Sequence, residues 1–374
     1  MIHRFTPIFL LLSLTAFAPV ANATRVTLPK PTGHLAVGTK SVVLLDPQRK
    51  MLRGGDQRRW IIQAFYPTES FGTQVFPYMP GTLEDGKVKG VQVLTHSKPD
   101  AMPLNQGPFP VIFFVHGLGN VRQSYTILCE ELASHGYIVL SLDQPYESNF
   151  VRFPDGSTVV LTFYDAWKMS NDRDYRYQYY DEAMDGTMGD IRFMLDHLKE
   201  IDHEFFSDLL DSSSISIMGH SFGGNVANTL GFEDPRIRSV VDIDSKITER
   251  KVHGRLGPPA NIQGKAVLFI RGAMQYQEDV GDLLKRVKNG RVINFNVQHS
   301  AFHDSAFLSR KIDGLENIGS IELVWKWLFK LGPPFGAIDI SLGGKDVEAW
   351  FHELRREIVD WLSIHFPRKQ KFAQ

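Results

Sequence analysis

The stretch SISIMGHSFGGNVANTL, residues 214–230, decides the fold. Its apolar first part ends abruptly at Gly219, and a segment of small residues with helical character follows Gly224. Between them, Ser221 has a glycine two positions away on each side. At a turn from strand to helix this G-x-S-x-G pattern is typical of a nucleophile elbow, where the serine takes a strained backbone conformation and nearby Cβ atoms would clash. The pattern predicts that Ser221 is a nucleophile rather than part of a plain glycine-rich turn.

Strand-like and helical segments alternate around this turn. Short apolar runs predict strands buried on both faces at 111–117, 137–143, 214–219, 237–244, 265–272 and 291–299. Helical spacing predicts helices at 122–136, 181–201, 225–230, near 278–288 and at 347–366. We expect two further strands at 41–47 and 58–67, and loops at 81–90 and 98–110. This alternation predicts an α/β fold with a mostly parallel central sheet and helices on both faces.

The composition is that of an ordinary globular protein. The chain has 374 residues, of which 43% are hydrophobic, and a formal net charge of −1. Proteins that bind nucleic acid usually carry a basic excess or a basic stripe, so the charge balance argues against a nucleic-acid partner. The single cysteine, Cys129, excludes an internal disulfide, and its place in a helical pattern favours a packed side chain over a reactive one.

The first residues have the pattern of a signal peptide. An apolar run at 8–18 is too short to span a bilayer, and Ala21-Asn22-Ala23 is a cleavage signal of the A-x-A type. We expect residues 1–23 to be removed and 24–374 to form a single domain that is periplasmic or secreted. The alternative is an uncleaved anchor at the same place.

A nucleophilic serine needs a base, and two histidines follow the last predicted strand. His299 comes directly after the run 291–298, and His303 lies four residues later. In this type of fold the imidazole is supplied by a loop after the last core strand, so the closer His299 is the preferred base. The two histidines share metal-ligand spacing, but no glutamate accompanies them as in H-E-x-x-H, so we expect no metal and no cofactor.

The acid that orients the histidine is not decided by spacing. Asp244 ends the strand 237–244, and Asp242 lies two residues earlier on the same face. Glu278 and Asp279 follow the next strand and are equally placed. Any of the four could fix the histidine tautomer and stabilise the imidazolium.

An oxyanion hole needs two backbone N–H groups. One is expected from Phe222, the residue after the nucleophile, and the other from the loop HGLGN at 116–120. Leu118 is the candidate donor there, because the glycines on either side let the backbone approach a substrate.

Four segments, in this order, resemble the platelet-activating-factor acetylhydrolase family, serine-dependent phospholipases with an α/β-hydrolase fold. They are FPVIFFVHGLGNVRQSY (109–125), ELASHGYIV (131–139), GHSFGGN (219–225) and QHSAFHD (298–304). The resemblance extends over about 33–366 and is strongest between 108 and 304; it suggests a bacterial-type, exported member.

The resemblance also assigns roles to residues. The family's HGLG loop matches 116–119, which supports Leu118, and its acid matches Asp244 rather than Glu278 or Asp279. Its H-x-x-F-x-D pattern supports His299 over His303. It implies metal-independent hydrolysis of a short or oxidised acyl chain at the second glycerol position of a phospholipid.

Two departures from the family affect the expected substrate. Ser245-Lys246 replaces an apolar stretch, and the insertion 144–180 differs in length and content. We expect the Tyr-rich part of the insertion, 163–182, to form a lid or pocket wall, with a surface excursion as the alternative. The aromatic segment 324–335 suggests transient contact with a membrane surface, with a core role as the alternative.

Other functions remain open on the same residues. A general carboxylesterase, lipase or polyester hydrolase would use the same triad. A catalytically silent binding protein is disfavoured because every triad position is filled. A dienelactone hydrolase is disfavoured because the nucleophile of that family is cysteine, whereas residue 221 is serine.

Overall fold

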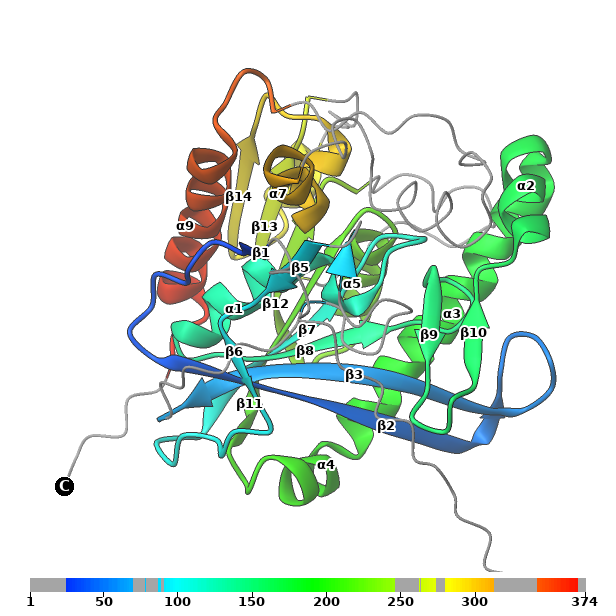
Figure 1. Ribbon diagram of the computed structural model, residues 1–374, viewed down its shortest axis with the longest axis horizontal. Helices are drawn as coiled ribbons and strands as arrows, with labels where there is room; N and C mark the ends of the chain where they lie inside the picture. The colour runs from blue at the N-terminus through cyan, green and yellow to red at the C-terminus, as the bar shows by residue number, and fades with distance from the viewer. Residues whose placement is uncertain are drawn as a thin grey trace, which may run out of the picture.

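The computed structural model describes residues 25–69, 78, 87–88, 91–245, 262, 264–273, 280–312 and 342–368 (Figure 1). The predicted signal peptide, the acid candidates Glu278 and Asp279, and the aromatic segment 324–335 lie outside these residues. Export and the single-domain extent of the chain therefore stay predictions. Among the described residues, no helix combines the length and apolar character that crossing a membrane would need.

The elements alternate as the sequence predicts. The strands are β1 Arg25–Thr27, β2 Ala36–Lys50, β3 Gln57–Thr68, β4 Lys87–Val88, β5 Val91–Leu94, β6 Ser97–Pro99, β7 Phe109–Val115, β8 Ile138–Asp143, β9 Phe150–Arg152, β10 Thr158–Val160, β11 Leu210–His220, β12 Ile237–Ile243, β13 Ala266–Arg271 and β14 Asn289–Asn294. The helices are η1 Arg122–Tyr125, α1 Thr126–Ser134, α2 Phe163–Asn171, α3 Arg173–Asp196, α4 Leu198–Phe205, α5 Phe222–Glu233, α6 Gly281–Leu284, η3 His299–Phe302, α7 Asp304–Lys311 and α9 Val347–His365.

A nine-stranded sheet organises the molecule, in the order β14-β13-β12-β11-β7-β8-β3-β2-β6. From β14 to β8 every neighbouring pair is parallel, and β3 pairs antiparallel with both β8 and β2. The carboxyl ends of β7, β11, β12 and β13 consequently meet at one edge of the sheet. In parallel α/β sheets this edge is where ligands bind. The predicted α/β fold with a mostly parallel sheet is confirmed.

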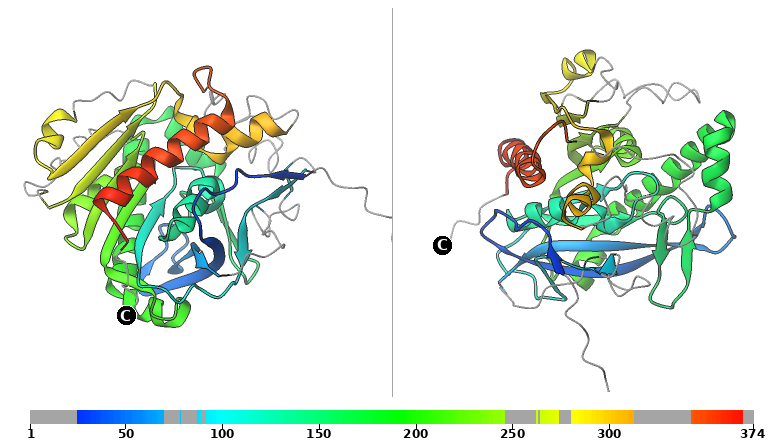
Figure 2. Two further views of the ribbon diagram at one scale, coloured as in Figure 1. Left: turned by 90° about the vertical axis from the view of Figure 1, so that its left-hand side faces the viewer. Right: turned by 45° about the horizontal axis from the view of Figure 1, so that its top comes forward.

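The two faces of the sheet are covered by different helices. Along β7, Val111, Phe113 and Val115 belong to one hydrophobic cluster, and Ile112 and Phe114 belong to the other, as strand alternation requires. The first cluster is closed by α3 and α5, and the second by α1, α7 and α9. Figure 2 shows α9, in red, lying across the sheet on the same face as α1.

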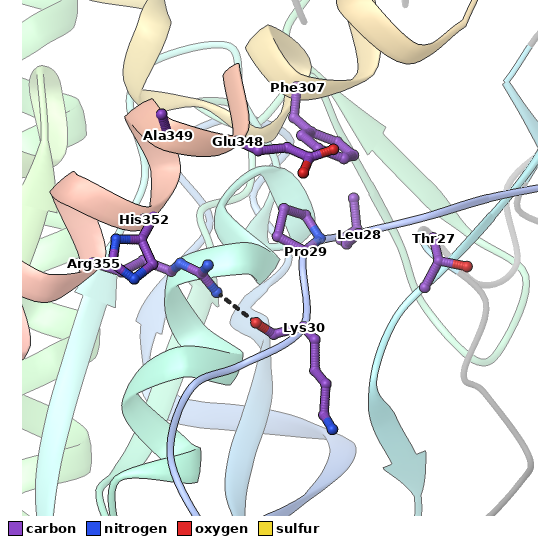
Figure 3. A pocket seen from close by; sticks show the side chains of 9 residues that line it. All are labelled: Thr27, Leu28, Pro29, Lys30, Phe307, Glu348, Ala349, His352 and Arg355. Carbon is purple, nitrogen blue, oxygen red and sulfur yellow. Dashed lines mark hydrogen bonds between the residues drawn. The ribbon is translucent and has the colours of Figure 1, made fainter. Parts of the chain in front are cut away.

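The chain before β2 is held against α9. Arg355, a buried residue of α9, donates from Nη1 to the Lys30 carbonyl at 3.1 Å and to Glu131 Oε2 at 2.8 Å. A groove of about 520 Å³ remains between residues 27–30 and α9 (Figure 3). No residue that lines this groove is a candidate site residue.

Several element boundaries differ from the prediction. The helix expected near 278–288 spans Gly281–Leu284 among the described residues, and the strand expected at 41–47 extends over Ala36–Lys50. The helix expected at 181–201 begins at Arg173, where Asp172 caps it by accepting from the Tyr175 N–H, and it ends at Asp196. The strand expected at 291–299 ends at Asn294. The predicted loop at 81–90 contains the short strand β4, which pairs with β5.

The insertion 144–180 is built of β9, β10, α2 and the first residues of α3. Its anchor is Arg53, in the turn between β2 and β3. Arg53 forms an ion pair with Asp165 at 3.1 Å, and its carbonyl accepts from the Tyr146 hydroxyl at 2.7 Å. Tyr179 donates in turn to the Tyr146 carbonyl at 2.6 Å. Figure 1 shows α2 at the end of α3 that projects beyond the sheet.

Removing one partner of the buried ion pair between Arg58 of β3 and Asp190 of α3 is predicted to destabilise the protein. The two groups lie 2.6 Å apart, with side chains 2% and 0% exposed. Asp190→Ala leaves Arg58 buried without its partner, which should lower the free energy of unfolding by about 3–5 kcal/mol. Urea denaturation measures the change. The control is Asp155→Ala, which breaks the surface ion pair with Arg59 and should change the free energy of unfolding little. If both variants lower the free energy of unfolding equally, leaving Arg58 unpaired has no special cost and the prediction is wrong.

Candidate active site

The turn between β11 and α5 has the geometry of a nucleophile elbow. Ser221 has φ 56° and ψ −119°, a strained conformation for a residue other than glycine. Its N–H donates to the Ile243 carbonyl at 2.9 Å, which fixes the turn to the end of β12. Phe222 begins α5, so Ser221 lies at a helix N-terminus, where developing negative charge is favoured.

The glycines on either side of Ser221 are required by close backbone contacts. A Cβ at Gly219 would lie 2.1 Å from the Gly223 carbonyl oxygen, and one at Gly223 would lie 2.0 Å from the Val115 carbonyl oxygen. Real Cβ atoms do not approach this closely. The turn is therefore compressed on itself and against the end of β7, which is the physical reason for the G-x-S-x-G spacing.

Asp244 and His299 lie in direct contact. His299 Nδ1 donates to Asp244 Oδ2 at 2.6 Å; the aspartate side chain is fully buried and the histidine side chain is 28% exposed. The other carboxylate oxygen, Oδ1, accepts from the Gly272 N–H at 2.8 Å. Asp244 itself has φ 50°, and its N–H donates to the Ile270 carbonyl at 2.7 Å. The carboxylate is thus held by backbone contacts from the neighbouring strand and oriented toward the ring.

Asp242, the alternative acid on the same strand, is used elsewhere. Its Oδ2 accepts from Arg271 at 2.9 Å and from Asn228 at 2.8 Å, and its Oδ1 accepts from the Ser245 N–H at 3.2 Å. The geometry therefore separates the two aspartates: Asp242 braces the turn after β12, and Asp244 contacts the histidine.

His303 lies behind the site in a buried cluster that the sequence did not reveal. Its Nε2 lies 3.2 Å from His220 Nδ1, and the Tyr125 hydroxyl lies 2.8 Å from that same atom. Burial, with the neighbouring histidines, lowers the pKa of His303 to about 3, so its ring is neutral. Burial also holds the pKa of His220 well below its usual value. Residues 125, 220 and 303 belong to no common sequence motif. The one sequence feature that indicates a role in the site is the position of His220 directly before Ser221.

The two candidate oxyanion donors flank Ser221. A Cβ at Gly117 would lie 3.4 Å from the Ser221 Cβ, so the loop 116–120 passes directly beside the nucleophile. The next residue, Leu118, is partly buried, and its N–H finds no acceptor within the described part of the chain. The Phe222 N–H belongs to the first turn of α5, whose amides have no partner within the helix.

One group of side chains offers metal-type ligands. The candidate ligand atoms of His220, Asp244 and His299 lie within 4.8 Å of one another. Asp244 Oδ2 already accepts from His299 Nδ1, so an ion that used both groups would have to displace that hydrogen bond. As it stands, the arrangement is suited to proton transfer at His299.

The elbow contacts predict that Gly219→Ala is strongly destabilising. The added Cβ meets a backbone carbonyl, which cannot move away as a side chain can, and overpacking of this kind costs about 1–3 kcal/mol or more. Gly264→Ala is the matched control, because a Cβ there has no neighbour within 4 Å among the residues that the structure describes. Chemical denaturation and labelling of Ser221 by a fluorophosphonate probe measure stability and site integrity. A Gly219→Ala variant that is as stable and as reactive as Gly264→Ala would refute the steric argument.

Comparison with known proteins identifies relatives by sequence and by fold. A sequence model of the family described as platelet-activating factor acetylhydrolase, isoform II, matches residues 89–153. A protein of Arthroderma benhamiae named probable 1-alkyl-2-acetylglycerophosphocholine esterase is 25% identical over 62% of this chain and 62% of its own length. Platelet-activating factor acetylhydrolase of Bos taurus is 29% identical over 68% of this chain and 60% of its own length. The chain thus spans less than two thirds of the length of these curated relatives.

Among solved structures, a ferulic acid esterase from Streptomyces cinnamoneus superposes with a TM-score of 0.70 and 21% sequence identity. The match covers 92% of this chain and 93% of the esterase, and at this identity it shows the fold alone. The sequence matches confirm the predicted resemblance: the chain is similar in sequence to the platelet-activating factor acetylhydrolase family, and its fold is that of an α/β hydrolase.

Proposed function

We propose that the chain is a serine-dependent carboxylic ester hydrolase with the triad Ser221, Asp244 and His299. The observation that carries the proposal is the 2.6 Å hydrogen bond between His299 Nδ1 and Asp244 Oδ2, at the sheet edge where the strained Ser221 turn also lies. An aspartate that accepts from Nδ1 fixes the tautomer in which Nε2 carries the lone pair that takes a proton. The names of the curated relatives, an esterase and acetylhydrolases, support the same reaction class.

The mechanism follows from these roles. Ser221 Oγ attacks the ester carbonyl while His299 Nε2 takes its proton and then gives it to the leaving alcohol. The carbonyl oxygen becomes an oxyanion, which the N–H groups of Leu118 and Phe222 stabilise. Water then attacks the acyl-enzyme with His299 as base again, which releases the acid and regenerates Ser221. No step requires a metal or a cofactor.

The proposed substrate is a phospholipid with a short or oxidised acyl chain at the second glycerol position. The names of the relatives from Arthroderma benhamiae and Bos taurus support this choice. The alternative is a general carboxylesterase, lipase or polyester hydrolase with the same triad, because the triad chemistry does not depend on the headgroup.

Hydrolysis assays on matched substrates test both the triad and the substrate class. Phosphatidylcholines that differ only in the second acyl chain, from acetyl to palmitoyl, are compared with a water-soluble short-chain ester. Ser221→Ala should lower kcat by about 10⁴–10⁶-fold, and His299→Gln by a comparable factor. The control is His352→Gln, an exposed histidine of α9, which should keep full activity.

The outcomes separate the alternatives. Fast cleavage of the acetyl lipid that falls steeply with chain length supports the acetylhydrolase assignment. Ser221-dependent cleavage of the soluble ester alone leaves an esterase and overturns the phospholipid assignment. If no substrate shows turnover that depends on Ser221, the proposed triad is wrong.

We also propose transient contact with a lipid surface through α2. Three aromatic side chains of this helix are exposed to solvent: Phe163 is 44% exposed, Tyr164 60% and Trp167 51%. The acidic residue of the helix, Asp165, is instead buried and forms an ion pair with Arg53. Aromatic side chains on a helix face whose acid is turned inward are suited to the boundary between water and lipid. The exposed side chains lie within residues 163–182, the stretch expected to form a lid or pocket wall.

Replacing both Tyr164 and Trp167 by alanine should weaken binding to phosphatidylcholine vesicles by about tenfold, because the aromatic area buried in the interface is lost. Vesicle sedimentation measures the binding. The control is Ile364→Ala, a residue of α9 that is 70% exposed. If the double variant and the control bind vesicles equally well, α2 is not the contact.

A further inference from the structure

The peptide between Gly117 and Leu118 has a fixed orientation. The Gly117 carbonyl oxygen faces His116 Nδ1 at 2.8 Å and accepts from the Asn120 N–H at 3.0 Å. In a planar trans peptide the carbonyl and the following N–H point in opposite directions. Holding the Gly117 carbonyl on one side therefore directs the Leu118 N–H to the other side, where it has no acceptor among the described residues.

The contacts of the His116 ring determine where its proton lies. The ring is fully buried, and burial lowers the pKa of His116, so the imidazole is neutral and carries a single N–H. A carbonyl oxygen can only accept, so the proton facing Gly117 must be on Nδ1. Nε2 is then an acceptor.

Ser148 completes the hydrogen-bond chain. Its Oγ lies 2.9 Å from His116 Nε2 and accepts from the Gln144 N–H at 2.9 Å. The Ser148 hydroxyl proton can therefore be donated to Nε2. Ser148 is fully buried, so bulk water does not compete for either contact.

Asp143 is the charged group that also faces this ring. Its Oδ1 lies 3.8 Å from His116 Nε2, beyond hydrogen-bond distance. The carboxylate is satisfied by Arg122, whose backbone N–H donates to Oδ1 at 2.7 Å and whose guanidinium pairs with Oδ2. Its charge is therefore balanced within the same cluster. Burial lowers the pKa of His116 by more than the Asp143 carboxylate raises it, so the ring stays neutral.

The rest of the oxyanion loop is tied to the same turn. The Gly119 N–H donates to the Glu147 carbonyl at 2.8 Å, and the Asn149 N–H donates to the Asn120 carbonyl at 3.0 Å. Residues 144–149 thus hold the loop 116–120 through backbone contacts, and Ser148 adds a side-chain contact that reaches the His116 ring.

We propose that His116 and Ser148 are positioning residues that set the orientation of the Gly117–Leu118 peptide, and with it the oxyanion hole. They act through a chain of hydrogen bonds with a fixed proton order, that is, a fixed donor in each bond. The Gln144 N–H donates to Ser148 Oγ, the Ser148 hydroxyl donates to His116 Nε2, and His116 Nδ1–H donates to the Gly117 carbonyl. The proposal rests on the proposed function, in which the Leu118 N–H stabilises the oxyanion. Without the Ser148 hydroxyl, Nε2 loses the donor that keeps the ring proton on Nδ1. The other tautomer would set a lone pair of His116 against the Gly117 carbonyl oxygen, which favours rotation of the peptide.

The first test is a set of kinetic variants. Ser148→Ala should lower kcat by about tenfold to a hundredfold with little change in KM, because an oxyanion donor acts mainly in the transition state. Affinity for an alkyl trifluoromethyl ketone should fall by a similar factor. In that adduct Ser221 Oγ bonds to the ketone carbon, its proton passes to His299, and the carbonyl oxygen becomes the oxyanion.

Further variants separate positioning from general destabilisation. Ser134→Ala is the matched control: like Ser148, Ser134 is fully buried and its hydroxyl makes two hydrogen bonds, but both are to backbone groups, since it donates to the Glu131 carbonyl and accepts from the Gly33 N–H. It should lower thermal stability but leave kcat unchanged. His116→Asn keeps an N–H donor at the δ position and should retain more activity than His116→Leu. Adding Ser148→Ala to His116→Asn should cost little more, since Ser148 acts through the ring.

Equal kcat losses in Ser148→Ala and Ser134→Ala, or additive losses in the double variant, would overturn the proposal. A wild-type protein without Ser221-dependent hydrolysis would overturn the proposed function instead. The proton order has its own readout in that case: ¹⁵N NMR of histidine-labelled protein, with the His116 signal identified by its absence in His116→Asn. A proton on Nδ1 supports the proposed order, and a proton on Nε2 contradicts it.

Discussion

The site depends on one steric constraint, the compression of the turn at Ser221. The Gly223 backbone lies so close to the end of β7 that a Cβ would come within 2.0 Å of the Val115 carbonyl oxygen. This contact joins the helix after the nucleophile to the strand before the oxyanion loop. The distance between Ser221 and the loop 116–120 is therefore set by backbone packing, which is stiffer than any contact between side chains.

The second half of the site is built in the same way. Asp244 is held by backbone N–H and carbonyl groups of the neighbouring segment, with Asp242 and Arg271 forming a buried ion pair beneath it. A buried pair of this kind contributes little net stability but keeps nearby groups in one arrangement. His299 is partly exposed, as a group that exchanges protons with a substrate must be.

The sheet and the elbow could be predicted because their signals are local. The local structure at His299 could not be predicted fully from the sequence. An apolar run indicates which residues are buried, but it does not show where strand pairing ends. Phe295 and Val297 remain buried after β14 has ended, and Phe295 packs against Trp350 with ring centroids 5.0 Å apart. The apolar run therefore continues to His299, although the strand stops at Asn294 and His299 begins a 3₁₀ turn.

Other features depend on partners far along the chain. Asp242 lies near the end of β12 and Asp244 directly follows that strand, so the sequence does not separate their roles; the contact of Asp242 with Arg271 of β13 does. His116 and Ser148 are 32 residues apart and show no common motif. The hydrophobic pattern does not indicate where α3 starts, because the first turns of this helix are rich in tyrosine and charged residues. Asp172, directly before them, is a typical N-cap residue and is the one local signal of the helix start.

The packing of α9 sets the order in which the chain can complete its fold. Leu354, Ile358 and Leu362 of this helix share a hydrophobic cluster with Ile127 and Leu132 of α1, and Arg355 fastens the segment at Lys30. The part of this face that α9 packs on, beside α1 and α7, therefore stays uncovered until residues 347–365 have been synthesised. A chain that lacks α9 keeps apolar surface of the sheet and of α1 exposed, so the fold can be completed only after its last helix is available.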